Sequence, residues 1–377
     1  MRADVLGLVV CTRISFLILT YLGIVLIHDA RIFGTPRVSF ALPLMDHWFH
    51  WDSMWYINIA RHGYVWSGWG GQSPTAHFPL YSLLIRDLGL ITGLPDKLVA
   101  IGLANLCYTA SMLVLYNLCH REFGDPAVAW RTVLYLSLFP TALFFFAPYS
   151  ESLFLLLTVS AFSALRRGQW WVAGLWAGLA ALTRVPGVLL TLPLAWDYLA
   201  ARGWRLRQVR ADALSLLIAP AALGGYMVAL AALTGDPLAF IHHASDWQRA
   251  PAWPWQALAG SVSALHTAAA NSFFQAHNLV ELCGVGLFII MLAAGARMLP
   301  PAYTLYGVAA LVLVLITPTS TDLPLTSVSR YLAAIFPAFM TLAVVGRRPL
   351  IHTLYISTAP GLLALFTVIY LNGGWVA

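Results

Sequence analysis

Long apolar runs, separated by short arginine clusters and by turns that contain proline or glycine, repeat along the entire chain. The first run occupies most of residues 1–27, and the last one ends at Trp375. A helix needs about 20 mostly apolar residues to cross a bilayer. The pattern therefore predicts an all-α, polytopic transmembrane helical bundle of about 10–12 spans. Two longer polar stretches, residues 28–76 and 234–277, are predicted as loops outside the membrane.

Breaks within the apolar runs predict where individual helices end. Proline and glycine interrupt helical hydrogen bonding, so one run should turn at residues 148–151 and the next at residues 184–187. Residues 78–92 form a shorter run that contains Arg86-Asp87. Either this run is a re-entrant segment, or one of the later helical hairpins has a topology other than the one predicted. The remaining runs predict spans over residues 98–118, 214–233, 279–296, 303–316 and 328–345.

Composition supports a membrane protein with one transmembrane domain over residues 1–377. Hydrophobic residues make up 60% of the chain, charged residues 10%, and the mean hydropathy is +0.77. A water-soluble domain could not bury that much apolar surface. The net charge of +6 comes almost entirely from arginine, which in a membrane protein sets topology and does not imply a nucleic-acid partner. The four cysteines lack metal-ligand spacing, so we interpret them as small core residues.

Arginine clusters orient the spans, because loops on the cytoplasmic side carry an excess of positive charge. Clusters at residues 121–131, 166–167, 202–210, 297 and 347–348 are predicted inside. The ionisable residues left for the outer side are few, and charge near the bilayer centre costs at least about 2.5 kcal/mol. We therefore expect them to share an aqueous cavity there; they are Asp52, Glu151, Arg184, Arg249 and Arg330.

Residues 46–56, directly after the first span, concentrate two carboxylates, two imidazoles and five aromatic side chains of phenylalanine, tyrosine and tryptophan. A carboxylate backed by arginines is suited to deprotonating a sugar hydroxyl while the cations hold a phosphate leaving group. Arginine suits phosphate because its planar fork binds oxygens bidentately and keeps its charge. Cytoplasmic nucleotide sugars cannot reach an outer site, so the donor is predicted to be a polyprenyl-phosphate-linked sugar.

Five sequence blocks, in order, resemble the GPI mannosyltransferase II (PIG-V) family and its bacterial relatives. The first reads His50-Trp51-Asp52-Ser53 and continues to Gly63-Tyr64. The others are His77-Phe78-Pro79, the stretch from Leu138-Phe139-Pro140 to Tyr149-Ser150-Glu151, Thr183-Arg184 with Gly187, and Ser329-Arg330-Tyr331 with Phe336-Pro337.

The resemblance implies the GT-C glycosyltransferase architecture, with a first outer loop that bears the catalytic carboxylate. Asp52 occupies that place and is predicted to be the general base. The predicted donor-phosphate and substrate-binding residues are Arg330, Arg184, Arg249, Glu151, Tyr149, Tyr331, His77, Trp247 and Trp51. The implied activity is transfer of mannose or a related sugar to a glycan, lipid or protein acceptor, without cofactor or metal. The lysine-poor, arginine-rich composition points to a bacterial cytoplasmic membrane with the site facing outside.

Other features of the sequence allow more than one interpretation. Asp46-His47 with His50 and Asp52, or His242-His243 with Asp246, could be drawn as metal ligands, but neither set has a recognised spacing. Residues 247–255 could form an aromatic belt at the membrane surface or a wall facing sugar. Gly224-Gly225 is interpreted as a close-packing position between helices. The alternative function is a transporter or flippase of an anionic lipid-linked substrate, and a third possibility is a non-catalytic assembly partner.

Overall fold

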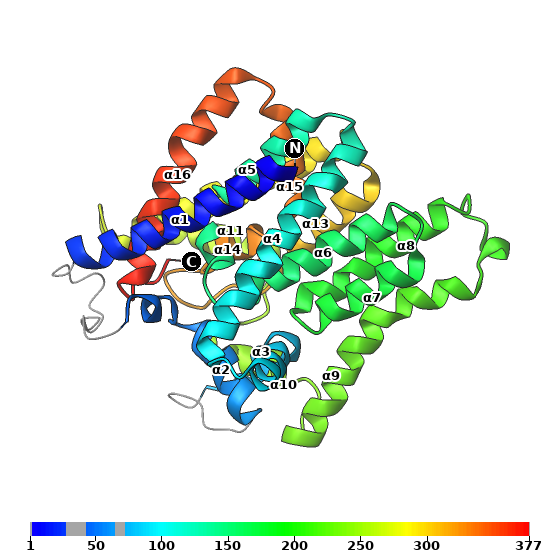
Figure 1. The fold of residues 1–377 in the computed structure, drawn as a ribbon, viewed down its shortest axis with the longest axis horizontal. Coiled ribbons are helices and arrows are strands. Elements are labelled where there is room, and N and C mark those ends of the chain that lie inside the picture. Colours follow the sequence, from blue (N-terminus) through cyan, green and yellow to red (C-terminus); the bar gives the residue numbers. More distant parts are fainter. Residues whose placement is uncertain (1, 28–42, 65–71, 377) are drawn as a thin grey trace. The chain divides into compact units, whose positions relative to one another are not determined.

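The computed structural model describes residues 2–27, 43–64 and 72–376 (Figure 1). Within these ranges the chain is helical, and its β-type pairing is limited to one antiparallel bridge between Arg249 and Thr319. The α-helices are α1 (Arg2–Leu26), α2 (Asp52–His62), α3 (Pro79–Thr92), α4 (Asp96–Phe123), α5 (Pro126–Ser137), α6 (Glu151–Leu165), α7 (Trp170–Ala181), α8 (Thr191–Ala200), α9 (Ile218–Thr234), α10 (Ala239–His242), α11 (Pro254–Thr267), α12 (Phe273–Gly295), α13 (Pro301–Leu315), α14 (Val328–Leu332), α15 (Phe336–Val345) and α16 (Pro349–Leu371).

Short 3₁₀ turns connect or precede several of these helices. They are η1 (Leu44–Trp48), η3 (Pro74–Ala76), η4 (Ala142–Phe145), η5 (Val185–Leu190), η6 (Leu206–Gln208), η7 (Ala211–Leu217) and η8 (His243–Trp247). The turns η4 and η5 lie beside the two predicted helix breaks, which confirms those breaks. The chain divides into two compact units: unit 1 holds residues 1–61, 81–159 and 342–377, and unit 2 holds residues 62–80 and 160–341.

Unit 1 is built around α1, which packs against α4, α5 and α16 (Figure 1). A partly buried cation in α1 joins this helix to α4 and η4. The Arg13 guanidinium donates from Nε to Asn105 Oδ1 at 2.9 Å and from Nη2 to the Phe145 carbonyl at 3.1 Å. Its Cζ also lies 3.8 Å from the centroid of the Tyr108 ring. These contacts offset the cost of a charge within an apolar helix, which explains how α1 tolerates an arginine.

Unit 2 contains a close contact in which α7 packs against η7 and α9. A Cβ atom at Gly178 would come within 2.7 Å of Ile218 Cγ2, and one at Gly174 would overlap the Ser215 carbonyl oxygen. Glycine is therefore required on this face of α7, as at many membrane helix interfaces. Other packed pairs in this unit include α8 with α13, α11 with α12, and α12 with α14.

Five described helices are long and apolar enough to cross a membrane: Ala3–Leu26, Asp96–Phe123, Ala211–Thr234, Phe273–Gly295 and Pro349–Leu371. Five shorter apolar helices accompany them, over Glu151–Leu165, Trp170–Ala181, Val185–Ala200, Pro301–Leu315 and Phe336–Val345. The all-α bundle and the integral membrane character are thus confirmed, whereas the count of 10–12 spans stays a prediction. Within the run at residues 78–92, Pro79–Thr92 form the amphipathic helix α3, and a re-entrant placement stays a prediction. Parts of the predicted first outer loop, residues 28–42 and 65–71, lie outside the described residues.

Two details of the predicted helices are wrong. The span predicted over residues 328–345 is interrupted after Leu332, and α15 begins only at Phe336. Pro337 explains the break, because it has no N–H to donate to the carbonyl four residues earlier and its ring clashes with that carbonyl. The close-packing role of Gly224-Gly225 is also wrong, since no described atom lies within 4 Å of a Cβ placed at either glycine.

Candidate active site

Asp52 is the first residue of α2 and follows a tightly held turn in unit 1. Trp51 adopts a left-handed backbone conformation with φ of 55°, which is uncommon for a residue with a side chain. The turn is fixed because the His50 carbonyl accepts hydrogen bonds from Ser53 Oγ at 2.7 Å and from the Tyr149 hydroxyl at 2.9 Å. The helix N-terminus favours the charged form of a carboxylate at this position. Backbone strain next to Asp52 is the kind of feature that functional sites retain.

The predicted block at residues 149–151 lies beside this turn. The Tyr56 hydroxyl and Ser150 Oγ are 2.7 Å apart, so α2 and the start of α6 are joined by a buried hydrogen bond. Glu151, the first residue of α6, is only 2% exposed, and Tyr149 is fully buried. Within unit 1 the fold therefore brings together segments that are about 100 positions apart in the sequence. These segments carry Asp52, Trp51, Tyr149 and Glu151 of the predicted site.

Two histidines before Asp52, His47 and His50, contact α16. His47 is buried, and its Nδ1 lies 3.2 Å from the Leu371 carbonyl, so Nδ1 is the protonated nitrogen. The His50 ring packs edge-on against Tyr370 with ring centroids 5.6 Å apart. Desolvation, with a smaller contribution from His47, lowers the pKa of His50 to about 4, so this imidazole is neutral at pH 7. Both rings serve as packing elements between η1 and α16.

The metal-ligand sets that the sequence suggested do not assemble. Among residues 2–27, 43–64 and 72–376, no three histidine, cysteine or acidic side chains come together as ligands would. Asp46 instead pairs with Lys97, with Oδ1 and Nζ 2.9 Å apart. Asp246 accepts a hydrogen bond from the Ser73 amide at 2.8 Å. Independence from metal stays a prediction for an activity assay.

Three guanidinium groups surround one aromatic ring in unit 2. The Cζ atoms of Arg184, Arg249 and Arg330 lie 5.0, 5.8 and 5.0 Å from the centroid of Tyr331. Arg330 is 5% exposed, and one of its Nη atoms lies 3.4 Å from the Tyr331 hydroxyl. Such a concentration of permanent cations in a poorly solvated place favours binding of a phosphate group. The structure brings these four residues together, and phosphate binding by them stays a prediction.

The three arginines of this cluster are held differently. Arg249 donates from Nη1 to the Thr317 carbonyl at 2.8 Å and from Nη2 to the Thr326 carbonyl at 2.9 Å, which commits much of its donor fork to the backbone. Arg184 sits at a turn that depends on Gly187, because a Cβ there would overlap the backbone of Ala180. Arg249 therefore clamps the loop that precedes α14.

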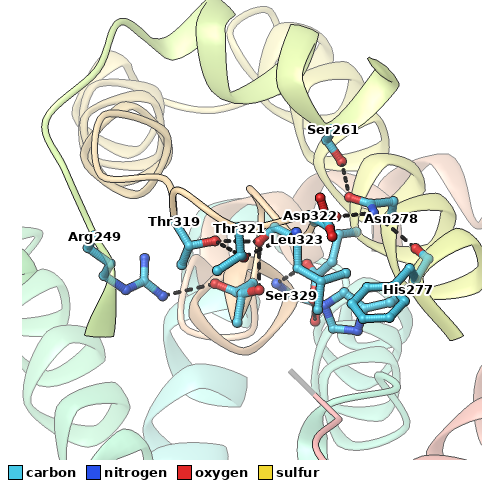
Figure 2. Close-up of polar contacts among 12 residues, drawn as sticks. Arg249, Ser261, His277, Asn278, Thr319, Thr321, Asp322, Leu323 and Ser329 are labelled. Atoms are coloured by element: carbon cyan, nitrogen blue, oxygen red, sulfur yellow. Dashed lines mark hydrogen bonds and ion pairs between the residues drawn. The ribbon is translucent and has the colours of Figure 1, made fainter. Parts of the chain in front are cut away.

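Glu281 is a buried residue next to this cluster that the sequence did not single out. It lies within α12, is 1% exposed, and accepts hydrogen bonds from the Ser329 amide at 2.7 Å and from Ser329 Oγ at 2.9 Å. The bonds fix the first turn of α14, which presents Arg330 and Tyr331. Nearby, Asn278 donates to the Asp322 carbonyl at 2.8 Å and accepts from Ser261, so α12 also holds the loop before α14 (Figure 2). An acidic residue inside an apolar run was the available signal.

His77 and Trp247, predicted as substrate-binding residues, are neighbours in unit 2. Their ring centroids are 5.8 Å apart in an edge-on arrangement. The His77 carbonyl accepts a 2.6 Å hydrogen bond from the Tyr64 hydroxyl. Trp51, by contrast, meets Trp375 in unit 1, with centroids 4.9 Å apart. The remaining tryptophans of the 247–255 segment, Trp253 and Trp255, are stacked and about 60% exposed, which suits an aromatic belt at a membrane surface.

Comparison with known proteins supports the same family as the sequence blocks. GPI alpha-1,6-mannosyltransferase 2 of Cricetulus griseus is 31% identical over 206 residues, which cover 50% of this chain and 41% of that protein. The human protein of the same name is 30% identical over the same shares. The chain thus spans about two-fifths of the length of these relatives.

Among solved structures, ArnT from Cupriavidus metallidurans bound to undecaprenyl phosphate superimposes with a TM-score of 0.51. It is 16% identical, and the match covers 90% of this chain and 60% of ArnT. The apo form of ArnT gives a TM-score of 0.52 with the same identity. The likeness shows that the fold is the GT-C glycosyltransferase architecture. The profile of the family described as Mannosyltransferase (PIG-V) matches residues 2–200, more than half of the 377 residues, and the chain belongs to that family.

Proposed function

We propose that this protein is a membrane mannosyltransferase that transfers mannose from a polyprenyl-phosphate donor to an acceptor hydroxyl. The observation that carries the proposal is the cluster of Arg184, Arg249 and Arg330 around Tyr331. Membership of the Mannosyltransferase (PIG-V) family supports the sugar, and the undecaprenyl phosphate bound by ArnT supports a lipid phosphate as the carrier. The family match does not support the alternative function of a transporter or flippase.

The proposed reaction needs a base for the acceptor hydroxyl and cations for the leaving group. In unit 1, Asp52 at the start of α2 takes the proton from the acceptor hydroxyl. The acceptor oxygen bonds to the anomeric carbon of mannose while the bond from that carbon to the phosphate oxygen breaks. The electron pair leaves with polyprenyl phosphate. In unit 2, Arg330 and Arg184 stabilise the negative charge that develops on this leaving group.

The remaining predicted residues take supporting roles in this proposal. Tyr149 holds the turn before Asp52 through the His50 carbonyl, and Glu151 lies at the start of the adjoining helix. His77, Trp247 and Trp51 offer rings for sugar or lipid contacts. We propose that the reaction takes place on the outer face of a bacterial cytoplasmic membrane. Its acceptor is a glycan, lipid or protein, and no cofactor or metal takes part.

A donor comparison tests the proposal. The purified protein in lipid nanodiscs is incubated with polyprenyl-phosphate mannose, polyprenyl-phosphate glucose or the nucleotide sugar GDP-mannose, each with excess chelator. Release of polyprenyl phosphate is expected from the mannose donor, with at least ~10-fold preference over the glucose donor, since one altered hydroxyl contact costs about 1–3 kcal/mol. Turnover of GDP-mannose without the lipid donor would contradict the proposal, as would loss of activity on chelation with rescue by a divalent ion.

A further inference from the structure

Unit 2 contains a cavity of about 620 Å³ that the proposed catalytic roles do not use. Its described walls come from two parts of the chain, one at the end of α2 and around η3, the other at the end of α9 and in η8. The residues that matter here are His62, Tyr64, Ser73, Thr75, Leu233 and His243. None of the eight described residues that line it is an arginine, lysine, aspartate or glutamate.

Hydrogen bonds to neighbouring segments hold the walls of this cavity in place. The Tyr226 hydroxyl of α9 donates to the Thr75 carbonyl at 2.7 Å, and Thr75 Oγ1 donates to the Ala239 carbonyl at 3.3 Å. The Ser73 amide donates to Asp246 Oδ2 at 2.8 Å. Ser73 and Thr75 are both almost fully buried. The cavity is therefore a preformed feature of the fold, as small-molecule sites usually are.

The chemistry of the walls selects a class of ligand. Hydroxyl and imidazole groups both donate and accept hydrogen bonds, which matches a ligand that carries several hydroxyl groups. The Tyr64 ring and the Leu233 side chain offer apolar surface for the C–H face of a sugar ring. A phosphate would lack a fixed positive charge here, whereas the arginine cluster around Tyr331 supplies three.

We infer that this cavity binds the uncharged saccharide portion of the acceptor. The inference rests on the proposed function, because a glycosyl acceptor must present a hydroxyl group to the enzyme. The chain supports the assignment, since the wall residue Thr75 lies two positions before His77. Asp246, which holds Ser73, directly precedes Trp247. The acceptor cavity and the His77–Trp247 ring pair thus belong to the same two segments.

A pair of tryptophan substitutions on α9 tests the inference. Leu233 lines the cavity and is 63% exposed, so Leu233→Trp fills space without disturbing a buried core. Val228 is 71% exposed on the same helix and does not line the cavity, which makes Val228→Trp the matched control. His62→Ala removes one hydrogen-bonding wall residue at an exposed position and serves as a second cavity variant.

The first readout is saturation-transfer NMR with the full chain in nanodiscs and a panel of methyl glycosides of mannose, glucose and N-acetylglucosamine. At least one glycoside should bind the parent and Val228→Trp equally, and its affinity should fall ~10-fold or more in Leu233→Trp and His62→Ala, as loss of a well-placed contact predicts. If the parent protein binds none of these glycosides, the inference is overturned. Equal binding by the parent and by Leu233→Trp would also overturn it. Competition by inorganic phosphate would also overturn it, by showing an anion site.

The second readout is release of polyprenyl phosphate from polyprenyl-phosphate mannose without acceptor. Affinity for the donor should be the same in the parent and in all three variants. Saccharide binding is measured without donor, so the cavity assignment is tested even if donor turnover fails in every variant. Normal donor turnover together with unchanged glycoside binding in Leu233→Trp would overturn the cavity assignment and leave the proposed function standing.

Discussion

Replacing Glu281 by leucine should destabilise the protein and weaken donor binding. Leucine has a similar volume but leaves the Ser329 amide and hydroxyl without the acceptors that lie 2.7 and 2.9 Å away. An orphaned buried donor costs about 1–3 kcal/mol, so the two together cost about 2–6 kcal/mol. Because leucine also removes the cost of burying a carboxylate, the net loss should fall near the lower end of that range. Glu281→Gln is the matched control, since its amide can still bond both Ser329 groups.

The assay for this prediction has two parts. Thermal unfolding in detergent should show a Tm several degrees lower for Glu281→Leu than for the parent, with Glu281→Gln close to the parent. Donor titration of the folded variants should show a raised KM in Glu281→Leu, because the turn that presents Arg330 is no longer fixed. Parental stability in Glu281→Leu, or equal destabilisation by leucine and glutamine, would refute the reasoning from these hydrogen bonds.

Further predictions concern the other parts of the candidate site. Arg330→Lys keeps the charge but loses the bidentate fork, so the KM for the donor should rise about 10-fold. Arg330→Ala should lower kcat as well. Parental kinetics in both variants would indicate that Arg330 is a membrane anchor and not a phosphate ligand. Gly187→Ala should lower Tm and donor turnover through overlap with Ala180, whereas Gly224→Ala, which meets no described atom within 4 Å, should leave both unchanged. His50, whose pKa falls from 6.5 to about 4 on folding, binds its proton more readily when unfolded, so stability is lost as pH drops from about 6.5 toward 4. The Tm of His50→Gln should therefore vary less with pH than the Tm of the parent. An equal dependence of Tm on pH in both proteins would contradict the lowered pKa of His50.

Much of the fold could be predicted because its causes are local. Apolar length specifies a span, and the breaks beside Glu151 and Arg184 follow from proline and glycine in the sequence. The break before Phe336 was missed although Pro337 was visible, because proline is also tolerated in the first turn of a helix. The predicted close packing at Gly224-Gly225 was wrong for another reason, because the small size of glycine permits close packing but does not require it. Gly174 and Gly178, in a run that looked equally apolar, are the positions where a neighbour comes close.

Residues of the candidate site could be predicted where they belong to a recognisable sequence block. Contacts between residues that are distant in the sequence could not be predicted. Arg184, Arg330 and Tyr331 belong to recognisable blocks, and the structure brings them together. The bonds of Glu281 to Ser329 join residues 48 positions apart, and no local pattern specifies that pairing. Arg249 was predicted as a phosphate ligand, but its bonds to two backbone carbonyls could be known only from the folded loop.

The central claim is most directly tested by donor turnover in Asp52→Asn beside a neighbouring control. Asparagine keeps the shape of the side chain but cannot accept the proton, so release of polyprenyl phosphate from polyprenyl-phosphate mannose should fall by about 100-fold or more. Met54→Leu, a volume-conserving change two positions later in α2, should retain turnover. The account predicts a folded, donor-binding and nearly inactive Asp52→Asn protein. Parental turnover by that variant would contradict it.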